Sequence, residues 1–174
     1  MQERKGIATF GSKPVTLVGP EIKVGDKAPE FRLIDPNLKE VALSDAAGKV
    51  RLIASVVSLD TGTCDLETQR FNSEAAKFES VQMYTISVDL PFAQRRFCEA
   101  RDVRNLVTLS DHRDVSFGTA YGVLMKELRL LARAVFIVDG KGVVRYVEYL
   151  REAGNPPDYD RALAALKGLV AKTK

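Results

Sequence analysis

The sequence predicts an α/β sandwich built on a mixed sheet, and two features support this prediction. Apolar, β-branched stretches at 50–58 and 81–88 are each followed by a segment whose apolar residues have helical spacing. A turn with two glycines at 140–142 then joins two strand-like stretches, which indicates a late hairpin. Strands that alternate with helices and end in a hairpin are typical of a sheet with parallel and antiparallel pairs.

The first part of the chain is predicted to form short strands joined by turns. The turn residues Gly11-Ser12-Lys13-Pro14 separate two β-prone stretches, which predicts a hairpin extension over residues 1–20. A second pair of strands is expected around Asp35-Pro36-Asn37. The predicted strands of this part are 7–10, 15–18, 31–34 and 41–43.

The stretch 50–58 is nearly continuous in apolar and β-branched residues, as expected of a central strand buried on both faces. In the helix predicted after it, buried-type residues recur at steps of four and three and so share one face. These residues are Cys64, Thr68, Phe71, Ala75 and Phe78. The thiol of Cys64 is therefore expected to face the core from the first turn of this helix.

After the strand at 81–88, Asp89 and Pro91 are interpreted as the N-cap and an early position of a second helix. This helix runs through Arg101 and carries Cys98 near its end. The later predicted elements are a strand at 106–109, a short helix at 115–121, hairpin strands at 133–139 and 143–149, and a last helix with the apolar stripe Tyr159, Leu163, Leu166 and Val170. Lys172 and Lys174 suit its C-terminal end electrostatically.

The composition predicts one soluble globular domain over residues 1–174, with 45% hydrophobic and 28% charged residues. No charge-free apolar stretch approaches the ~20 residues of a membrane span, and no signal-peptide core follows Arg4 and Lys5, so we expect no membrane association and a cytoplasmic location. The 26 basic and 23 acidic residues are scattered, which argues against nucleic-acid binding. Cys64 and Cys98 are too far apart for a Cys-x-x-Cys pair, and they would act as individual thiols or as one long-range pair.

Cys64 is the first candidate for chemistry, because unpaired N–H groups and the helix dipole stabilise a thiolate at a helix N-terminus. Asp65 and Glu67 would oppose this if they point inward. Arg133, a single guanidinium at the start of an apolar strand, is the candidate cationic partner. Thr61 is a candidate to hold its hydroxyl against the sulfur or a bound oxygen.

Each candidate also has a structural interpretation that the residues themselves leave open. Cys64 and Cys98 would also serve as small buried hydrophobic residues. Arg133 would also solvate a strand end, and Thr61 would also form a turn or a helix cap.

Three long motifs occur in order along the chain: Ser58-Leu59-Asp60-Thr61-Gly62-Thr63-Cys64, Thr85-Ile86-Ser87-Val88-Asp89-Leu90-Pro91-Phe92-Ala93-Gln94-Arg95-Arg96-Phe97-Cys98 and Leu128-Arg129-Leu130-Leu131-Ala132-Arg133-Ala134-Val135. Together they closely resemble the bacterial thiol peroxidases, the atypical two-cysteine branch of the peroxiredoxins. The resemblance implies a thioredoxin-like fold with a mixed central sheet, flanking helices and the N-terminal hairpin, a homodimer, and no metal or organic cofactor.

Carried over by position, the resemblance implies that Cys64 is the peroxidatic cysteine and Cys98 the resolving cysteine, with Thr61 and Arg133 beside the peroxide. The implied cycle oxidises Cys64 to a sulfenic acid with hydrogen peroxide or an organic hydroperoxide, then forms an intramolecular disulfide with Cys98, which thioredoxin reduces. Apolar Leu124, Met125, Leu128 and Leu130 are expected near the mouth of the site, where they suit alkyl groups.

One position departs from the family pattern Pro-x-x-x-Thr-x-x-Cys, because Val57 occupies the proline slot. Valine fills similar apolar space, but it leaves a backbone N–H to satisfy and does not fix φ. We therefore expect peroxidase activity that is retained but weaker than in relatives with the proline.

Two other functions are weighed against this one. A cysteine hydrolase would need His112, the only histidine, as its base, and replacing His112 with alanine would separate the two functions. A binding module with a purely structural bond between Cys64 and Cys98 would keep that bond in the presence of thioredoxin. Metal binding is not expected, because two cysteines and one histidine at these spacings make no compact ligand set.

Overall fold

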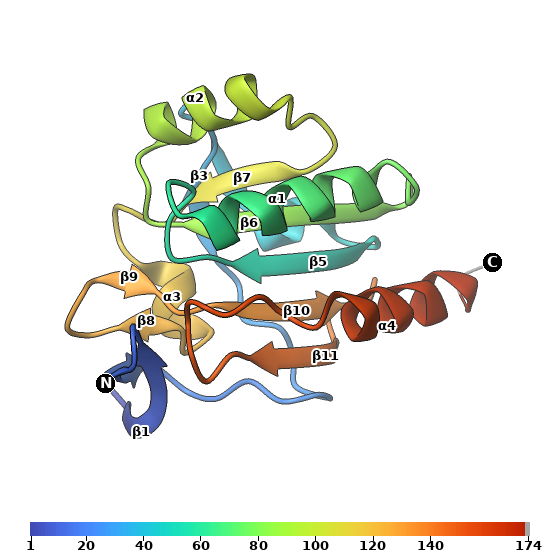
Figure 1. Cartoon of the computed structure of the whole chain (residues 1–174). Coiled ribbons are helices and arrows are strands. Elements are labelled where there is room, and N and C mark those ends of the chain that lie inside the picture. Colours follow the sequence, from blue (N-terminus) through green and yellow to red (C-terminus); the bar gives the residue numbers. More distant parts are fainter. Residues whose placement is uncertain (173–174) are drawn as a thin grey trace.

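The computed structural model describes residues 1–172, and its main sheet confirms the predicted mixture of parallel and antiparallel pairs (Figure 1). Within the described residues the sheet has seven strands, in the order β11 (Val144–Tyr149), β10 (Ala134–Val138), β5 (Val50–Ser55), β6 (Val81–Ser87), β7 (Val107–Ser110), β3 (Arg32–Ile34) and β4 (Glu40–Ala42). The central strands β5, β6 and β7 pair in parallel, and the pairs that flank them are antiparallel.

Helices α1 (Gly62–Ala75), α2 (Pro91–Arg101) and α4 (Tyr159–Ala171) contribute to the core on one face of this sheet. Their side chains Phe71, Phe97 and Leu163 pack in one cluster with Leu52 and Val135 of the sheet. The alternate residues of the same strands point to the other face, as the pleat requires. The apolar stripe predicted for α4 is present, and Lys172 is its C-cap, whereas Lys174 lies outside the described residues.

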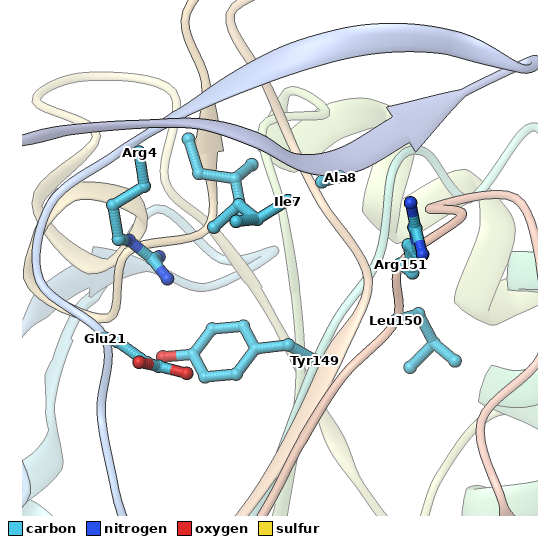
Figure 2. A pocket seen from close by; sticks show the side chains of 8 residues that line it. Arg4, Ile7, Ala8, Glu21, Tyr149, Leu150 and Arg151 are labelled. Carbon is cyan, nitrogen blue, oxygen red and sulfur yellow. The ribbon is translucent and has the colours of Figure 1, made fainter.

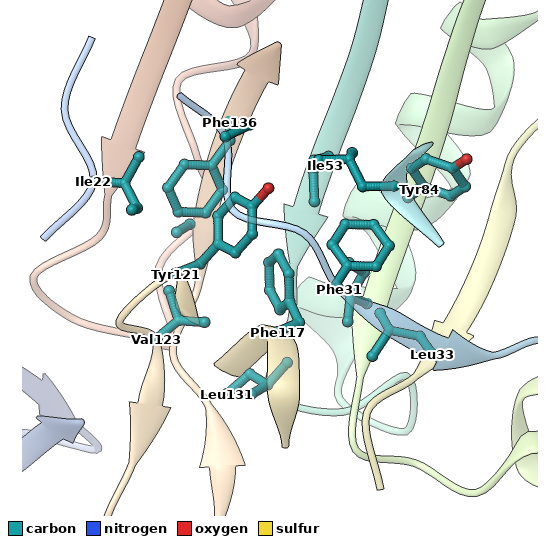
Figure 3. Packing of buried hydrophobic residues seen from close by; sticks show 14 of the residues in the cluster. Ile22, Phe31, Leu33, Ile53, Tyr84, Phe117, Tyr121, Val123, Leu131 and Phe136 are labelled. Carbon is teal, nitrogen blue, oxygen red and sulfur yellow. The ribbon is translucent and has the colours of Figure 1, made fainter. Parts of the chain in front are cut away.

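The opposite face is covered by an aromatic cluster that includes the short helix α3 (Ser116–Ala120) (Figure 3). Phe117 of α3 stacks on Tyr121 with ring centroids 4.5 Å apart, and Phe31 and Phe136 meet Phe117 edge-on. The hydroxyl of Tyr121 donates to the carbonyl of Pro29 at 2.8 Å. The cluster therefore ties the loop before β3 to the sheet.

A short 3-10 helix, Leu43–Ala46, follows β4 and replaces the end of the strand predicted at 41–43.

The predicted N-terminal hairpin is confirmed as β1 (Glu3–Phe10) and β2 (Lys13–Val18). It extends into a second sheet, in the order β1-β2-β8-β9, through β8 (Leu124–Met125) and β9 (Leu130–Leu131). The sequence did not predict these last two strands, because two residues are too few to show a periodic pattern.

The hairpin is fixed to the main sheet by Arg4. Its guanidinium lies over the ring of Tyr149 on β11, with 5.5 Å to the centroid, and its Nε donates to the carbonyl of Gly19 at 3.1 Å. Figure 2 shows this contact in a pocket of about 250 Å³, which Ile7 and Ala8 of β1 also line. The hairpin therefore packs firmly onto the core.

Several element boundaries differ from the predicted ranges, and two of these differences concern the elements on either side of Cys64. Strand β5 ends at Ser55, so residues 56–58 of the predicted strand form a bend that leads the chain out of the sheet toward α1. Helix α1 ends at Ala75, and Phe78 packs on the same core from the following turn. No helix within residues 1–172 is long and apolar enough to span a bilayer.

Candidate active site

Cys64 lies in the first turn of α1 and is completely buried, as the helical spacing predicted. Thr61 is the N-cap, with extended backbone angles (φ −95°, ψ 143°). The sulfur packs among apolar side chains in a cluster that spans the hairpin, the bend after β5 and strand β8, and that includes Val15, Val57 and Met125. The thiol therefore lies in an apolar region, where a charged partner has a large effect.

Arg133 provides that partner from the position just before β10. Its side chain is 1% exposed, and Nη2 donates to Sγ of Cys64 at 3.1 Å. Nη1 pairs with Oε2 of Glu67, and Nε donates to the carbonyl of Ala153 at 3.3 Å. Burial would lower the pKa of Arg133, but the negative groups Glu67 and Cys64 outweigh it and raise that pKa, so the cation persists.

Glu67 is a site residue that the sequence analysis considered only as an opposing charge. It is completely buried one turn after Cys64, and burial raises the pKa of Glu67 from 4.5 to about 7 despite its ion pair with Arg133. Its second carboxylate oxygen, Oε1, has no hydrogen-bond partner within the described residues. The only sequence signal was its three-residue spacing from Cys64, which places both side chains on one side of the helix.

Thr61 is half-buried, and its hydroxyl donates to the carbonyl of Ser58 at 3.0 Å. The amide of Thr61 donates to the same carbonyl at 3.1 Å, which closes a tight turn before the helix. The hydroxyl thus contacts the loop and not the sulfur, and the lone pairs of its oxygen remain available as acceptors.

Asp89 corrects the predicted cap of α2. The N-cap is Leu90, without a side-chain cap bond, and Pro91 is the first helical residue. The Asp89 carboxylate instead accepts hydrogen bonds from the hydroxyl of Ser58 at 2.7 Å and from the amide of Leu59 at 2.8 Å. Because this contact joins residues 30 positions apart, local cap statistics did not indicate it.

Val57 is 2% exposed and packs in the same cluster as Cys64. Its amide has no hydrogen-bond partner in the part of the chain that the structure describes. A proline here would therefore remove no bond. The bend is held by the contacts of Asp89 at the next two residues.

Cys98 is half-buried on α2 and is a free thiol, as is Cys64. Its Sγ lies 3.4 Å from the hydroxyl of Thr108, and burial raises the pKa of Cys98. Cys98 packs at the edge of the core cluster beneath the helices. Cys64 belongs instead to the cluster that includes Val15 and Val57. Phe97 contacts both clusters. The two thiols are therefore unpaired and pack in different clusters.

An ion pair joins the two helices that carry these cysteines. Arg101, in the last turn of α2, reaches the carboxylate of Asp65 in the first turn of α1, with Nη2 to Oδ2 at 2.6 Å and Nε to Oδ2 at 3.0 Å. Asp65 therefore points toward α2 and away from Cys64, unlike Glu67.

The other candidates lie elsewhere. His112 bonds the hydroxyl of Ser110 through Nδ1 at 2.9 Å, in the loop before α3. No group of three or more His, Cys, Asp or Glu side chains within residues 1–172 is arranged to hold a metal ion.

The apolar residues expected at the mouth separate into different regions. Leu124 is in the aromatic core, which corrects its predicted position, whereas Met125 and Leu130 pack in the cluster of Cys64. Leu128 is 43% exposed and lines a groove of about 420 Å³ against the hairpin residues Phe10, Pro14 and Val15.

Comparisons with known proteins agree with this architecture. The Redoxin family model matches residues 23–163. The thiol peroxidase of Bacillus subtilis (strain 168) is 56% identical over 162 residues, covering 93% of this chain and 97% of that protein. The thiol peroxidase of Halalkalibacterium halodurans is 55% identical over 159 residues, covering 91% of this chain and 96% of that protein.

Among solved structures, the peroxiredoxin-like protein from Aquifex aeolicus aligns with a TM-score of 0.88 at 41% identity, covering 95% of this chain and 98% of that chain. The mixed sheet and its helices are thus the expected thioredoxin-like fold. On this combined evidence the chain belongs to the Redoxin family and, within it, to the thiol peroxidases.

Proposed function

We propose that this thiol peroxidase reduces hydrogen peroxide and organic hydroperoxides at Cys64, in antioxidant defence. The observation that supports this most directly is the 3.1 Å contact from Arg133 to the sulfur of Cys64, in a buried helix N-terminus. A guanidinium and helix amides together stabilise a thiolate, which is the nucleophilic form of cysteine.

In the proposed first step, the Cys64 thiolate attacks the terminal oxygen of the peroxide in line with the O–O bond. That bond breaks, the sulfur becomes a sulfenic acid, and water or an alcohol leaves. The free N–H groups of Arg133 orient the peroxide and stabilise the charge on its oxygens, and the Thr61 oxygen accepts the peroxide's hydrogen bond.

In the proposed second step, Cys98 attacks the sulfur of Cys64, a disulfide forms, and water leaves. Disulfide geometry requires Cα atoms about 4.4 to 6.8 Å apart, so the first turn of α1 and the segment around Cys98 must unwind locally. A thioredoxin then reduces the disulfide through a mixed disulfide. The cycle needs no metal or organic cofactor.

Organic hydroperoxides fit the groove beside Leu128. Phe10 and Val15 line this groove and also belong to the cluster that holds Cys64, so an alkyl chain bound there would contact two residues of that cluster. We further propose a cytoplasmic homodimer, for which the exposed Phe92 at the start of α2 offers an apolar contact surface.

The test measures loss of hydrogen peroxide and of cumene hydroperoxide with a thioredoxin, its reductase and NADPH. Cys64→Ser should abolish turnover, and Cys98→Ser should abolish thioredoxin-dependent turnover while leaving one oxidation per chain. His112→Ala is the matched control and should keep full activity, because its ring bonds Ser110 and not Cys64. Mass spectrometry should find the link between Cys64 and Cys98 after one equivalent of peroxide. Turnover that survives Cys64→Ser would reject the proposal.

A further inference from the structure

The buried site holds two acids and one cation. Cys64, Glu67 and Arg133 are each at most 1% exposed, and Arg133 touches both acids through different nitrogens. An uncompensated charge in a buried environment is strongly disfavoured, so the group favours a net charge of zero. With Arg133 positive, only one of the two acids is ionised in the neutral state.

Arg133 is the cation that acts on Glu67, and within residues 1–172 no second cation acts on this carboxylate to compensate a second anion. The charged and titratable side chains that act on this group are Arg133 before β10, Glu148 on β11 and Tyr159 on α4, besides Cys64 on its own helix. Glu148 is itself acidic and opposes ionisation of Glu67. Arg70 acts on Tyr159 from α1 and pairs with Glu74.

We propose that Glu67 is protonated while Cys64 is a thiolate, and that it gives up this proton when the sulfur is oxidised to the sulfenic acid. This inference rests on the assignment of Cys64 as the thiol that reacts with peroxide.

The step balances in atoms, electrons and charge. The Cys64 thiolate forms a bond to the terminal peroxide oxygen, the O–O bond breaks, and sulfur loses the two electrons that the peroxide gains. The leaving oxygen requires one proton to become water or an alcohol, and Glu67 supplies it. The thiolate and the neutral carboxyl are thus replaced by a neutral sulfenic acid and a carboxylate, so the charge around Arg133 stays at zero.

The geometry of Glu67 agrees with this role as a proton store. Oε2 keeps the contact with Arg133 in both states, while Oε1 has no partner within residues 1–172 and is free to carry the proton. Burial raises the pKa of Glu67 to about 7, so the protonated carboxyl is populated near neutral pH. Glu67 does not contact the sulfur itself, and Arg133 lies between the two acids.

The first experiment follows the carboxyl group by infrared difference spectroscopy in the Cys98→Ser protein, which stops at the sulfenic acid. At pH 6 we expect the C=O band of a protonated carboxyl in the reduced protein, its loss when one equivalent of peroxide is added, and its absence in Glu67→Gln. Glu74→Gln is the matched control, since Glu74 is a buried acid on the same helix that pairs with Arg70 and Lys77. Carbon-13 labelling of glutamate identifies the band without any substitution at Glu67.

The second experiment measures protons exchanged with a weak buffer during the same single turnover. The protein with Glu67 should take up no net proton, whereas Glu67→Gln should take up one proton from solution for each Cys64 oxidised. A protonated-carboxyl band that is absent or unchanged by peroxide, or one proton taken up with Glu67 present, would overturn the inference. Mass spectrometry of Cys64 keeps the two proposals apart: no sulfenic acid would instead reject the proposed function.

Discussion

Glu67 and Arg133 form a buried pair in which the protonation of Glu67 depends on pH over the physiological range. Burial raises the folded-state pKa of Glu67 from 4.5 to about 7. A carboxyl whose pKa is raised by folding contributes stability below pH 4.5, and this contribution is lost as the pH rises through about 7.

The first prediction concerns this pH dependence. The wild type should lose up to about 3 kcal/mol of unfolding free energy between pH 4.5 and 7, and Glu67→Gln should not show this loss. Urea denaturation of both proteins across this range measures the difference, with Glu74→Gln as the control. Parallel curves for the wild type and Glu67→Gln would contradict the burial of an ionisable Glu67.

The second prediction concerns the geometry of the guanidinium. Arg133→Lys keeps the charge but cannot contact Glu67, Cys64 and Ala153 from three nitrogens at once. We expect a roughly 10²- to 10³-fold slower reaction of Cys64 with peroxide, as when a preorganised donor is removed. Stopped-flow kinetics measures the rate, and circular dichroism at the same temperature verifies folding. A rate within a few-fold of wild type would mean that charge alone suffices.

At the scale of elements, the loop between β5 and α1 is held from outside by Asp89, and we expect this contact to replace part of the restraint that a proline at position 57 would give. Asp89→Ala leaves the amide of Leu59 and the hydroxyl of Ser58 without their acceptor. We expect a loss of about 1 to 3 kcal/mol of stability and a slower peroxide reaction.

The same loop offers a compensating change. Val57→Pro should be tolerated, since the Val57 amide has no partner within residues 1–172, and it should restore part of the rate lost in Asp89→Ala. Asp60→Ala, at an exposed position of the same loop, is the control and should change neither property. If Val57→Pro lowers the rate in both backgrounds, Asp89 does not substitute for the proline.

The ion pair between Arg101 and Asp65 links the two segments that, in the proposed cycle, unwind before the disulfide forms. Arg101→Gln removes a partly exposed pair worth up to ~1 kcal/mol, so disulfide formation should accelerate by up to roughly fivefold while the peroxide step is unchanged. Rapid quench with thiol labelling separates the two steps.

In hydrogen exchange, residues 62–66 and 96–102 should lose protection on oxidation. Equal protection of these residues in the reduced and oxidised states would argue against unwinding.

At the scale of the whole molecule, the N-terminal hairpin is part of the apolar cluster that surrounds Cys64. Leu17 of β2 packs in the cluster that holds Cys64, whereas Leu52 of β5 packs beneath the helices on the other cluster. Leu17→Ala and Leu52→Ala should each cost about 2 to 5 kcal/mol. Only Leu17→Ala should also slow the peroxide step, measured well below both melting temperatures. Equal effects of the two substitutions on that rate would show that the hairpin only stabilises the fold.

Much of this arrangement was predictable because it depends on local periodicity. The step pattern from Cys64 to Ala75 fixed a helix face, and the continuous apolar stretches marked the central strands. The boundaries at Ser55 and Ala75 were less predictable, since apolar residues continue beyond both elements: Val56 and Val57 remain buried in the bend, and Phe78 is partly buried after α1. Strands β8 and β9 were too short to produce any pattern.

By itself the sequence determined the order of the elements apart from the short strands β8 and β9 and the 3-10 helix, the burial of Cys64 in the first turn of α1, and Arg133 as a candidate partner. The tertiary structure decided which acids matter: Asp65 turns to Arg101 on α2, Glu67 turns inward to Arg133, and Asp89 serves a loop and not a helix cap. The physical reason is that these contacts join residues 30 or more positions apart, and that the charge state of Glu67 follows from desolvation. Desolvation depends on the packing of the whole chain, whereas periodicity is a property of neighbours in sequence.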